Sequence, residues 1–255
     1  MCLLNTPLLS LALALMPAVA LASSPSLVIA EVQTRGTHGG LDEAVALYNP
    51  TDTAISLAGW KLLARSSSAS SYYTRWTGTS SQVIPAHGYF LIANSGYVGY
   101  SGSAAPDATY SMGISDAGSI ALQDPAWTIV DIVAFYYDAA TQSLVTASSL
   151  FLVEGTTVSN QPHTDVLSST SSRDVSLQRR FDAASGHPQD TDDNAADFRY
   201  GQRSVLHNST VTLTATLDSD ADGVPDLQDN CPSAANPDQL DDDVDGDGDD
   251  CDMTP

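Results

Sequence analysis

Residues 42–62 read DEAVALYNPTDTAISLAGWKL, and they carry the clearest signal of the fold. Val45 and Leu47 occupy alternate positions, which is typical of a strand that packs one face on a core. Residues 49–52, Asn-Pro-Thr-Asp, form a turn signal, because proline fixes φ and aspartate can bond to its own backbone. The apolar run over residues 55–64 predicts the next strand. Two strands joined by a turn are therefore expected here.

The same pattern continues on both sides of this stretch, from Leu27 to about Tyr200. Short apolar runs, rich in Val, Ile, Tyr and Phe, alternate with Gly, Pro, Asn, Asp and Ser, and such runs predict strands. Outside the N-terminal segment, no window shows sustained apolar residues at helical spacing. We therefore predict an all-β sandwich over residues 27–203.

Three segments fit this pattern less well. Residues 66–71 (SSSASS) predict a serine-rich surface loop, and Asp138–Arg173 is a long insertion, rich in Ser and Thr and only partly strand-like. A sandwich edge tolerates such insertions because the cost of loop closure grows slowly with length. Residues 204–217 alternate like a strand, so they are either a linker or a last strand.

The N-terminal segment predicts export. Residues 1–22 contain an apolar run that ends in Ala20-Leu21-Ala22, a small-x-small cleavage signal. The run is short for a membrane span, which needs about 20 apolar residues. We expect a cleaved signal peptide rather than an uncleaved anchor, and no transmembrane segment in the mature chain. The predicted location is secreted or extracellular, with retention at the cell surface as a further option.

The charge of the chain is strongly negative and unevenly distributed. The formal net charge is −22, with 31 acidic and 9 basic residues, and the segment from Asp218 to the end has 14 Asp but no Lys or Arg. An acidic chain repels phosphate backbones, so we expect no direct nucleic-acid partner. Divalent cations are the natural counter-charge.

A repeat organises these aspartates. Residues 218–229 (DSDADGVPDLQD) and 241–252 (DDDVDGDGDDCD) share the pattern D-x-D-x-D-G-x-x-D-x-x-D. Calcium takes six to eight oxygen ligands, and a glycine at position 6 permits the sharp bend that brings carboxylates together around one ion. The predicted ligands are Asp218, Asp220, Asp222, Val224 (by its carbonyl), Asp226 and Asp229, then Asp241, Asp243, Asp245, Asp247 (by its carbonyl), Asp249 and Asp252.

Disorder and helix-flanked calcium loops account less well for the acidic segment. A solvated, disordered tail would not repeat the pattern at every position. EF-hand and dockerin loops need flanking helices, which Pro225 and Pro232 disfavour. After removal of the signal peptide, Cys231 and Cys251 are the two remaining cysteines, and in an exported chain they suggest a single disulfide, with two free thiols as the alternative.

A search for catalytic residues gives no candidate, so the chain is predicted not to be an enzyme. The five histidines have no metalloprotease spacing, and there is neither a G-x-S-x-G elbow nor a phosphate-binding loop; they are His38, His87, His163, His187 and His207. The acidic stretch Asp190–Asp197 can be read as a cation site, but a capped loop is the preferred interpretation.

Several motifs of the first domain resemble the lamin-tail domain. They are DEAVALYNPTDTAISLAGWKL, VIPAHGYFLIA (83–93), ISDAGSIALQDPAWTIVDIVAF (114–135), VEGTT (153–157) and residues 176–198. Ala46 stands where a Glu is common, and Asp124–Trp127 replaces a simpler turn. The resemblance implies an immunoglobulin-like sandwich that acts as a binding or attachment module, with Leu57 and Trp60 in the core.

The segment 218–252 resembles a thrombospondin type 3 repeat, including DNCP, NPDQ and the closing DCD. That resemblance implies an extended segment without regular secondary structure, calcium as a structural ion, and a disulfide between Cys231 and Cys251. Because little apolar surface is available there, metal binding would supply most of the folding energy.

These observations predict a secreted, non-enzymatic calcium-binding protein that serves in adhesion or attachment at an extracellular surface, with calcium ions and an unidentified protein or surface as partners. One alternative is an accessory component of an extracellular nuclease or phosphatase system. A calcium sensor is less favoured, because no bistable helical element is visible.

Overall fold

The computed structural model describes residues 26–99, 104–147, 151–163, 172–173, 175–182, 185–201, 206–212, 218–224, 226, 229–240 and 248–252. The predicted signal peptide, residues 1–22, lies outside the described residues. Within the described part of the chain, no helix is long and apolar enough to cross a membrane.

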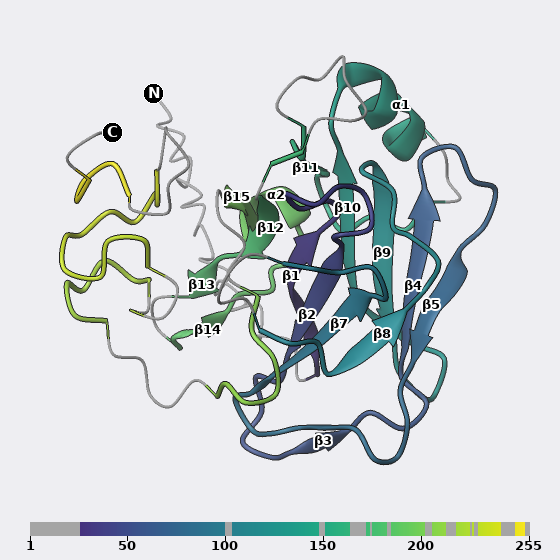
Figure 1. Ribbon diagram of the computed structural model, residues 1–255, viewed down its shortest axis with the longest axis horizontal. Helices are drawn as coiled ribbons and strands as arrows, with labels where there is room; N and C mark the ends of the chain where they lie inside the picture. The colour runs from purple at the N-terminus through teal and green to yellow at the C-terminus, as the bar shows by residue number, and fades with distance from the viewer. Residues whose placement is uncertain are drawn as a thin grey trace, which may run out of the picture.

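Two β-sheets form the body of the protein (Figure 1). The six-stranded sheet has the order β15-β12-β1-β2-β7-β8. Its strands are β1 (Val28–Gln33), β2 (Ala44–Tyr48), β7 (Tyr89–Asn94), β8 (Ala108–Tyr110), β12 (Ser176–Arg179) and β15 (Phe198–Gly201). All neighbouring pairs are antiparallel except β7 and β8, which run parallel.

The five-stranded sheet has the order β11-β10-β9-β4-β5. Its strands are β4 (Lys61–Ser66), β5 (Tyr73–Thr77), β9 (Gly118–Gln123), β10 (Ile129–Tyr136) and β11 (Val158–Ser159). Two short ribbons complete the β-structure, one of β3 (Ile55–Ser56) with β6 (Val83–Ile84) and one of β13 (Phe181–Asp182) with β14 (His187–Pro188). The predicted all-β sandwich is confirmed.

The core lies between the two sheets and follows the alternation of the strands. Val45, Leu47 and Phe90 of the six-stranded sheet pack in one cluster with Leu62 and Ile120 of the five-stranded sheet. Leu57 and Trp60 join this cluster from the turn that leads into β4. The amide of Trp60 donates to the carbonyl of Leu57 (3.1 Å), and Gly59 has φ +80°, which favours glycine at this bend.

Both faces of the six-stranded sheet are buried at its centre. The residues of β2 that point away from the core, Ala44 and Ala46, pack with Leu206. On the same outer face, Tyr48 and Tyr89 pack with Val211. Residues 206–212 therefore lie along this sheet, which explains why β1, β2 and β7 read as nearly continuous apolar runs.

The structure contains a helix that the sequence pattern did not predict. Helix α1 (Ala139–Ala147) lies in the long insertion, which we predicted to be only partly strand-like. The carboxylate of Asp138 accepts a hydrogen bond from the amide of Thr141 (2.7 Å) and so satisfies a free N–H of the first turn. In this helix only Thr141 and Val145 are buried, so its apolar periodicity is too weak to detect. A second helix, α2 (Asn194–Asp197), is a single turn.

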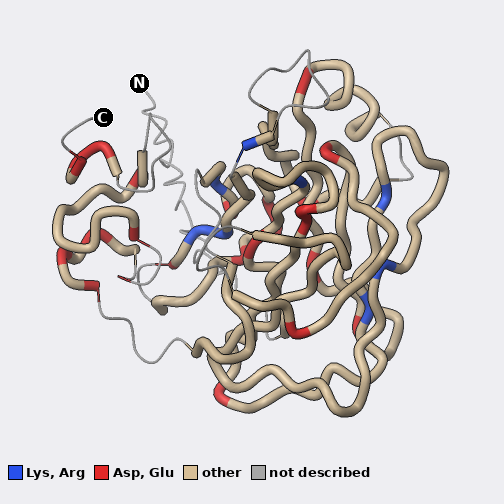
Figure 2. The backbone as a smooth tube through the Cα atoms, in the orientation of Figure 1, with Lys and Arg blue, Asp and Glu red and all other residues tan. Residues whose placement is uncertain are grey.

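The C-terminal segment is irregular, as predicted. Its described residues form turns and bends without a strand or helix. Figure 2 shows acidic residues in this segment and the Lys and Arg residues on the sandwich. The stability of this segment must therefore come from interactions other than the backbone hydrogen bonds of helices and sheets or an apolar core.

Candidate metal site

The first acidic loop brings three carboxylates together. Asp218, Asp220 and Asp222 each place one side-chain oxygen within 4.8 Å of the others. The sequence predicted these three residues at positions 1, 3 and 5 of the loop. Their convergence follows from the tight winding of the chain between them.

Local hydrogen bonds set this winding. The amide of Gly223 donates to Asp218 Oδ2 (3.1 Å), and the amide of Asp222 donates to Asp220 Oδ1 (3.2 Å). Gly223 has φ +94° and Ala221 has φ +62°, so the chain enters the left-handed region twice within three residues. Each of the two bonded carboxylates keeps a second oxygen that takes no part in the winding.

Three carboxylate oxygens in the loop are buried and have no hydrogen-bond partner in the described structure. They are Asp218 Oδ1, Asp220 Oδ2 and Asp229 Oδ2. Desolvation raises the pKa of Asp220, and the neighbouring charges of Asp222, Asp229 and Asp218 raise it further. A buried anionic oxygen without a donor is costly unless a positive charge faces it. The loop is thus chemically suited to a cation.

Among the residues that the structure describes, the other predicted ligands do not belong to this cluster of three carboxylates. Both oxygens of Asp226 accept hydrogen bonds from Ser219, one from its amide and one from its hydroxyl, each at 2.7 Å. Val224, whose carbonyl is the predicted ligand at position 7, is buried. In the second loop Asp241, Asp243, Asp245 and Asp247 lie outside the described residues. Asp249 and Asp252 are described, and their amides donate to Leu240 and Gly248 carbonyls at 2.9 and 2.8 Å.

A disulfide and a polar network connect the two loops. Cys231 and Cys251 form the predicted disulfide, with a Cα–Cα distance of 5.6 Å. Asp229 Oδ1 accepts hydrogen bonds from the Cys231 amide (2.8 Å) and from the Gln239 side chain (2.7 Å). Asp229 is therefore held in place by one oxygen while the other points away from these donors.

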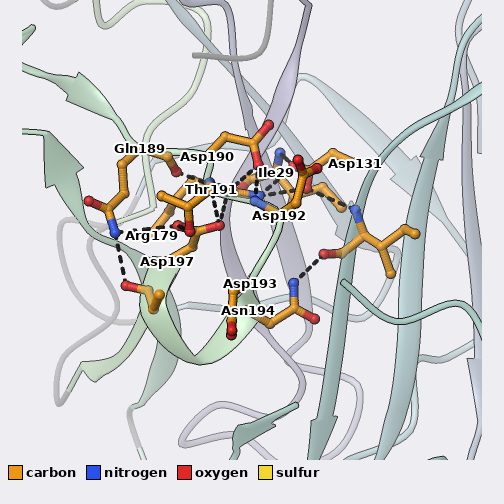
Figure 3. Close-up of polar contacts among 12 residues, drawn as sticks. Ile29, Asp131, Arg179, Gln189, Asp190, Thr191, Asp192, Asp193, Asn194 and Asp197 are labelled. Atoms are coloured by element: carbon orange, nitrogen blue, oxygen red, sulfur yellow. Dashed lines mark hydrogen bonds and ion pairs between the residues drawn. The ribbon is translucent and has the colours of Figure 1, made fainter. Parts of the chain in front are cut away.

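A second group of acidic residues lies inside the sandwich, around Arg179 (Figure 3). Arg179 of β12 and Asp131 of β10 are both 0 % exposed, and the guanidinium contacts both Asp131 oxygens at 2.6 Å. Arg179 also donates to the backbone carbonyls of Ile29 (2.8 Å) and Gln189 (2.9 Å). This arrangement is a buried ion pair that ties three segments of the chain together.

Glu154 and Asp190 complete this group. Asp131, Glu154 and Asp190 place side-chain oxygens within 4.8 Å of one another. Burial, followed by the charges of Asp131 and Asp190, raises the pKa of Glu154 to about 9. Glu154 is thus protonated at neutral pH. Arg179 and the proton on Glu154 already offset much of the negative charge of this group. The first tail loop, in contrast, has neither an arginine nor a lysine.

The acidic stretch Asp190–Asp197 is part of this scaffold. The Asp193 side chain caps α2 by accepting a hydrogen bond from the Ala195 amide (3.1 Å). Asp197 accepts from the amide (2.9 Å) and hydroxyl (2.7 Å) of Thr191. Both contacts are those of the capped loop that the sequence favoured.

The Arg179 group was not predicted, although the sequence contains a signal for it. Leu177 and Arg179 are two residues apart in a strand, so their side chains point to the same face. Because Leu177 belongs to the core, Arg179 had to be buried too. A buried arginine requires carboxylate partners; Asp190 and Asp197 follow it in the sequence, and the closest partner, Asp131, precedes it.

Comparisons with known proteins agree with the motifs. Residues 21–137 match the family model described as Lamin Tail Domain, and residues 216–239 match the model of the Thrombospondin type 3 repeat. No curated protein matches the chain. Among solved structures, it is similar to a DUF4876 family protein from Bacteroides thetaiotaomicron VPI-5482, with 10 % identity, a TM-score of 0.45, and coverage of 76 % of this chain and 74 % of that chain. The predicted order of the two domains is confirmed.

Proposed function

We propose that this chain, a lamin tail domain followed by a thrombospondin type 3 repeat, is a secreted, non-enzymatic calcium-binding protein. In this proposal the sandwich is an attachment module at an extracellular surface, and calcium orders the C-terminal segment. Both matched domains are of non-catalytic types. The observation that carries the proposal is the set of three buried, unpartnered carboxylate oxygens in the first loop.

The donor set favours calcium over other cations. Every side-chain ligand predicted for the two loops is a carboxylate, and hard oxygen ligands suit calcium and magnesium rather than softer metals. Magnesium demands near-octahedral geometry and keeps several waters, whereas calcium accepts six to eight ligands in flexible arrangements. A loop that offers five carboxylates and a carbonyl suits the larger ion.

Calcium would also supply the stability that the tail lacks. The segment from Asp218 to the end carries 14 Asp and no basic residue. Val224 and Cys231 are its buried apolar residues in the described structure. With so little apolar burial, ion binding provides the folding free energy, and the disulfide limits the freedom of the unfolded segment.

The extracellular location rests on two features. Thrombospondin type 3 repeats are typical of extracellular proteins, and the disulfide of this repeat suits an oxidising compartment. Extracellular fluids also contain calcium at concentrations that fill weak carboxylate sites, which bind in the range of about 10⁻⁴–10⁻³ M. The order of the tail would then depend on external calcium.

Calorimetric titration of the full chain with calcium tests this proposal. We expect the double variant Asp218→Asn/Asp220→Asn to lose binding at the first loop and to keep binding at the second. Asp238→Asn is the matched control, because Asp238 is an exposed aspartate of the same segment outside both loops. Equal stoichiometry and affinity in the wild type and the double variant would contradict the assignment of the ligands. A parallel titration with magnesium should give weaker binding.

A further inference from the structure

The turn between β9 and β10 displays a tryptophan to solvent. Trp127 is 72 % exposed, the highest value among the large hydrophobic side chains of the described chain. Its φ is +72°, a region that residues with a Cβ rarely adopt. Folding alone would favour glycine or asparagine at this position and a smaller exposed surface. The combination points to a role for the indole ring outside the fold.

The backbone around Trp127 is well fixed. The Trp127 amide donates to the carbonyl of Asp124 (3.0 Å), and the Asp124 amide donates to the carbonyl of Thr128 (2.9 Å). The Thr128 amide donates to Asp124 Oδ1 (2.8 Å), and the Gln123 side chain donates to the Trp127 carbonyl (3.3 Å). The ring is thus presented on a defined turn.

One face of the indole is covered by the only lysine of the chain. Lys61 Nζ lies 3.7 Å from the ring centroid. This cation–π contact orients the ring, and the large exposed fraction of Trp127 leaves its other surfaces in solvent. Lys61 precedes the core-facing Leu62 in β4, so it lies on the outer face of the five-stranded sheet.

The cross-strand row beside the ring on this outer face is polar up to Ile129 of β10, which is paired with Gln123. Lys61 is directly opposite Thr77 of β5 on one side and Gln123 of β9 on the other. Thr77 is exposed, and Lys61 and Gln123 are partly exposed. At the other end of this face, Ala134 is covered by Val145 and Phe151. We call Lys61, Thr77, Gln123, Asp124 and Trp127 the Trp127 platform.

We propose that the Trp127 platform binds a neutral saccharide. The face of an aromatic ring is negative and attracts the weakly positive C–H hydrogens of a sugar ring. The ammonium of Lys61, the amide of Gln123, the hydroxyl of Thr77 and the carboxylate of Asp124 offer donors and acceptors to sugar hydroxyls. Lys61 and Asp124 balance in charge, and the net charge of −22 repels polyanionic glycans.

A protein partner fits this surface less well. Stable protein interfaces bury about 800 Å² on each side and have an apolar centre with several aromatic or aliphatic contacts. On the platform Trp127 is the single large apolar side chain, and the apolar residues beside it on the same face, Leu63 and Ile129, are partly buried. The proposal rests on the attachment role proposed above for the sandwich, and it names the chemical class of the partner.

The test uses the full-length protein, saturated with calcium, and a panel of neutral polysaccharides: cellulose, chitin, xylan, mannan and starch. Alginate and heparin serve as polyanionic probes, and an immobilised casein digest as a peptide probe. Trp60 and Trp76 are 6 % and 5 % exposed, so acrylamide quenching of tryptophan fluorescence reports mainly Trp127. We expect at least one neutral polysaccharide to bind and to protect this fluorescence from quenching.

The variants Trp127→Ala and Trp127→Gly should lose at least tenfold in saccharide affinity, and the glycine also relieves the strained φ. Tyr73→Ala removes another exposed aromatic residue and should bind as the wild type does. Failure of every neutral polysaccharide, binding of a polyanion or peptide alone, or unchanged binding by both Trp127 variants would overturn the proposal. Binding should persist in EDTA, because the platform lies on the sandwich. The calcium titration can therefore fail while saccharide binding is still observed, so the failure of one proposal is distinguishable from the failure of the other.

Discussion

Replacement of Arg179 by methionine is the sharpest test of how the sandwich is held together. The change keeps an unbranched apolar side chain in place of the aliphatic part of the arginine and removes the guanidinium. Asp131 then loses both of its 2.6 Å contacts, and the carbonyls of Ile29 and Gln189 lose their donor. The side chain of Asp131 is 0 % exposed, so water cannot replace these contacts without opening the fold.

The expected loss of stability follows from these contacts. Removal of one partner from a buried ion pair costs about 3–5 kcal/mol. The buried Ile29 carbonyl, left without this donor, costs about 1–3 kcal/mol, whereas the Gln189 carbonyl is only partly buried. Because the polar loop can relax, we expect a total of about 5 kcal/mol. For a domain of this size that corresponds to a decrease in Tm of roughly 10–20 °C. Unfolding in guanidinium chloride with saturating calcium, followed by tryptophan fluorescence, measures the free energy directly.

Two further results decide whether the unpaired charge of Asp131 causes the loss of stability. The double variant Asp131→Asn/Arg179→Met also removes the charge of the closest partner, so it should be more stable than Arg179→Met alone; Asp190 and Asp197 lose their 3.5 Å contacts in both variants. The penalty of Arg179→Met should also be smaller at pH 5 than at pH 8, because burial raises the pKa of Asp131 to about 6 and its protonation neutralises the buried charge. A penalty below about 1 kcal/mol, or one that is equal at both pH values, would refute this reasoning.

Three other predictions concern titration and the disulfide. The pKa of Glu154 is raised from 4.5 to about 9, so folding stability should fall as the pH rises between these values. Glu154→Gln should remove this part of the pH dependence of Tm, measured by thermal unfolding at pH 5.5, 7 and 9. Parallel curves of Tm against pH for both proteins would contradict the prediction. Burial lowers the pKa of His207 from 6.5 to about 4, so acidification through this range should destabilise the wild type. His207→Gln should show a weaker decline in Tm over the same pH range. An unchanged decline would exclude His207 as its source. Cys231→Ser/Cys251→Ser removes a disulfide with a sequence separation of 20, which stabilises the tail by about 3 kcal/mol. Calorimetry should show weaker calcium binding, with the Tm of the sandwich unchanged. An unaltered calcium affinity would argue against coupling between the disulfide and calcium binding.

The sequence predicted the parts of this protein in which local pattern and tertiary structure agree. Alternation at Val45 and Leu47 indicated a strand, and both residues are in the core. The glycines and aspartates of the first tail loop indicated that carboxylates converge there, because these residues are close in sequence. Asp218, Asp220 and Asp222 need no distant segment to bring them together.

Features that depend on distant contacts were harder to predict. Helix α1 buries only Thr141 and Val145, so its stability comes mainly from its cap and from the sheet beneath it. Asp131 and Arg179 are separated by 48 residues. Pairing of β1 with β12 brings Arg179 to Ile29, and packing of β10 of the other sheet against β1 brings Asp131 to the same residue. The exposure of Trp127 depends on the hairpin geometry of residues 124–128, which its composition does not specify.

The two domains deal with the same excess of acidic residues in different ways. The sandwich buries Asp131 and Asp197 but pairs them with Arg179 and keeps Glu154 protonated. The segment that begins at Asp218 contains no lysine or arginine. A cation from the solvent is the counter-charge that we propose for its buried carboxylate oxygens. This difference predicts that chelation of calcium destabilises the tail alone, while alkaline pH acts first on the sandwich.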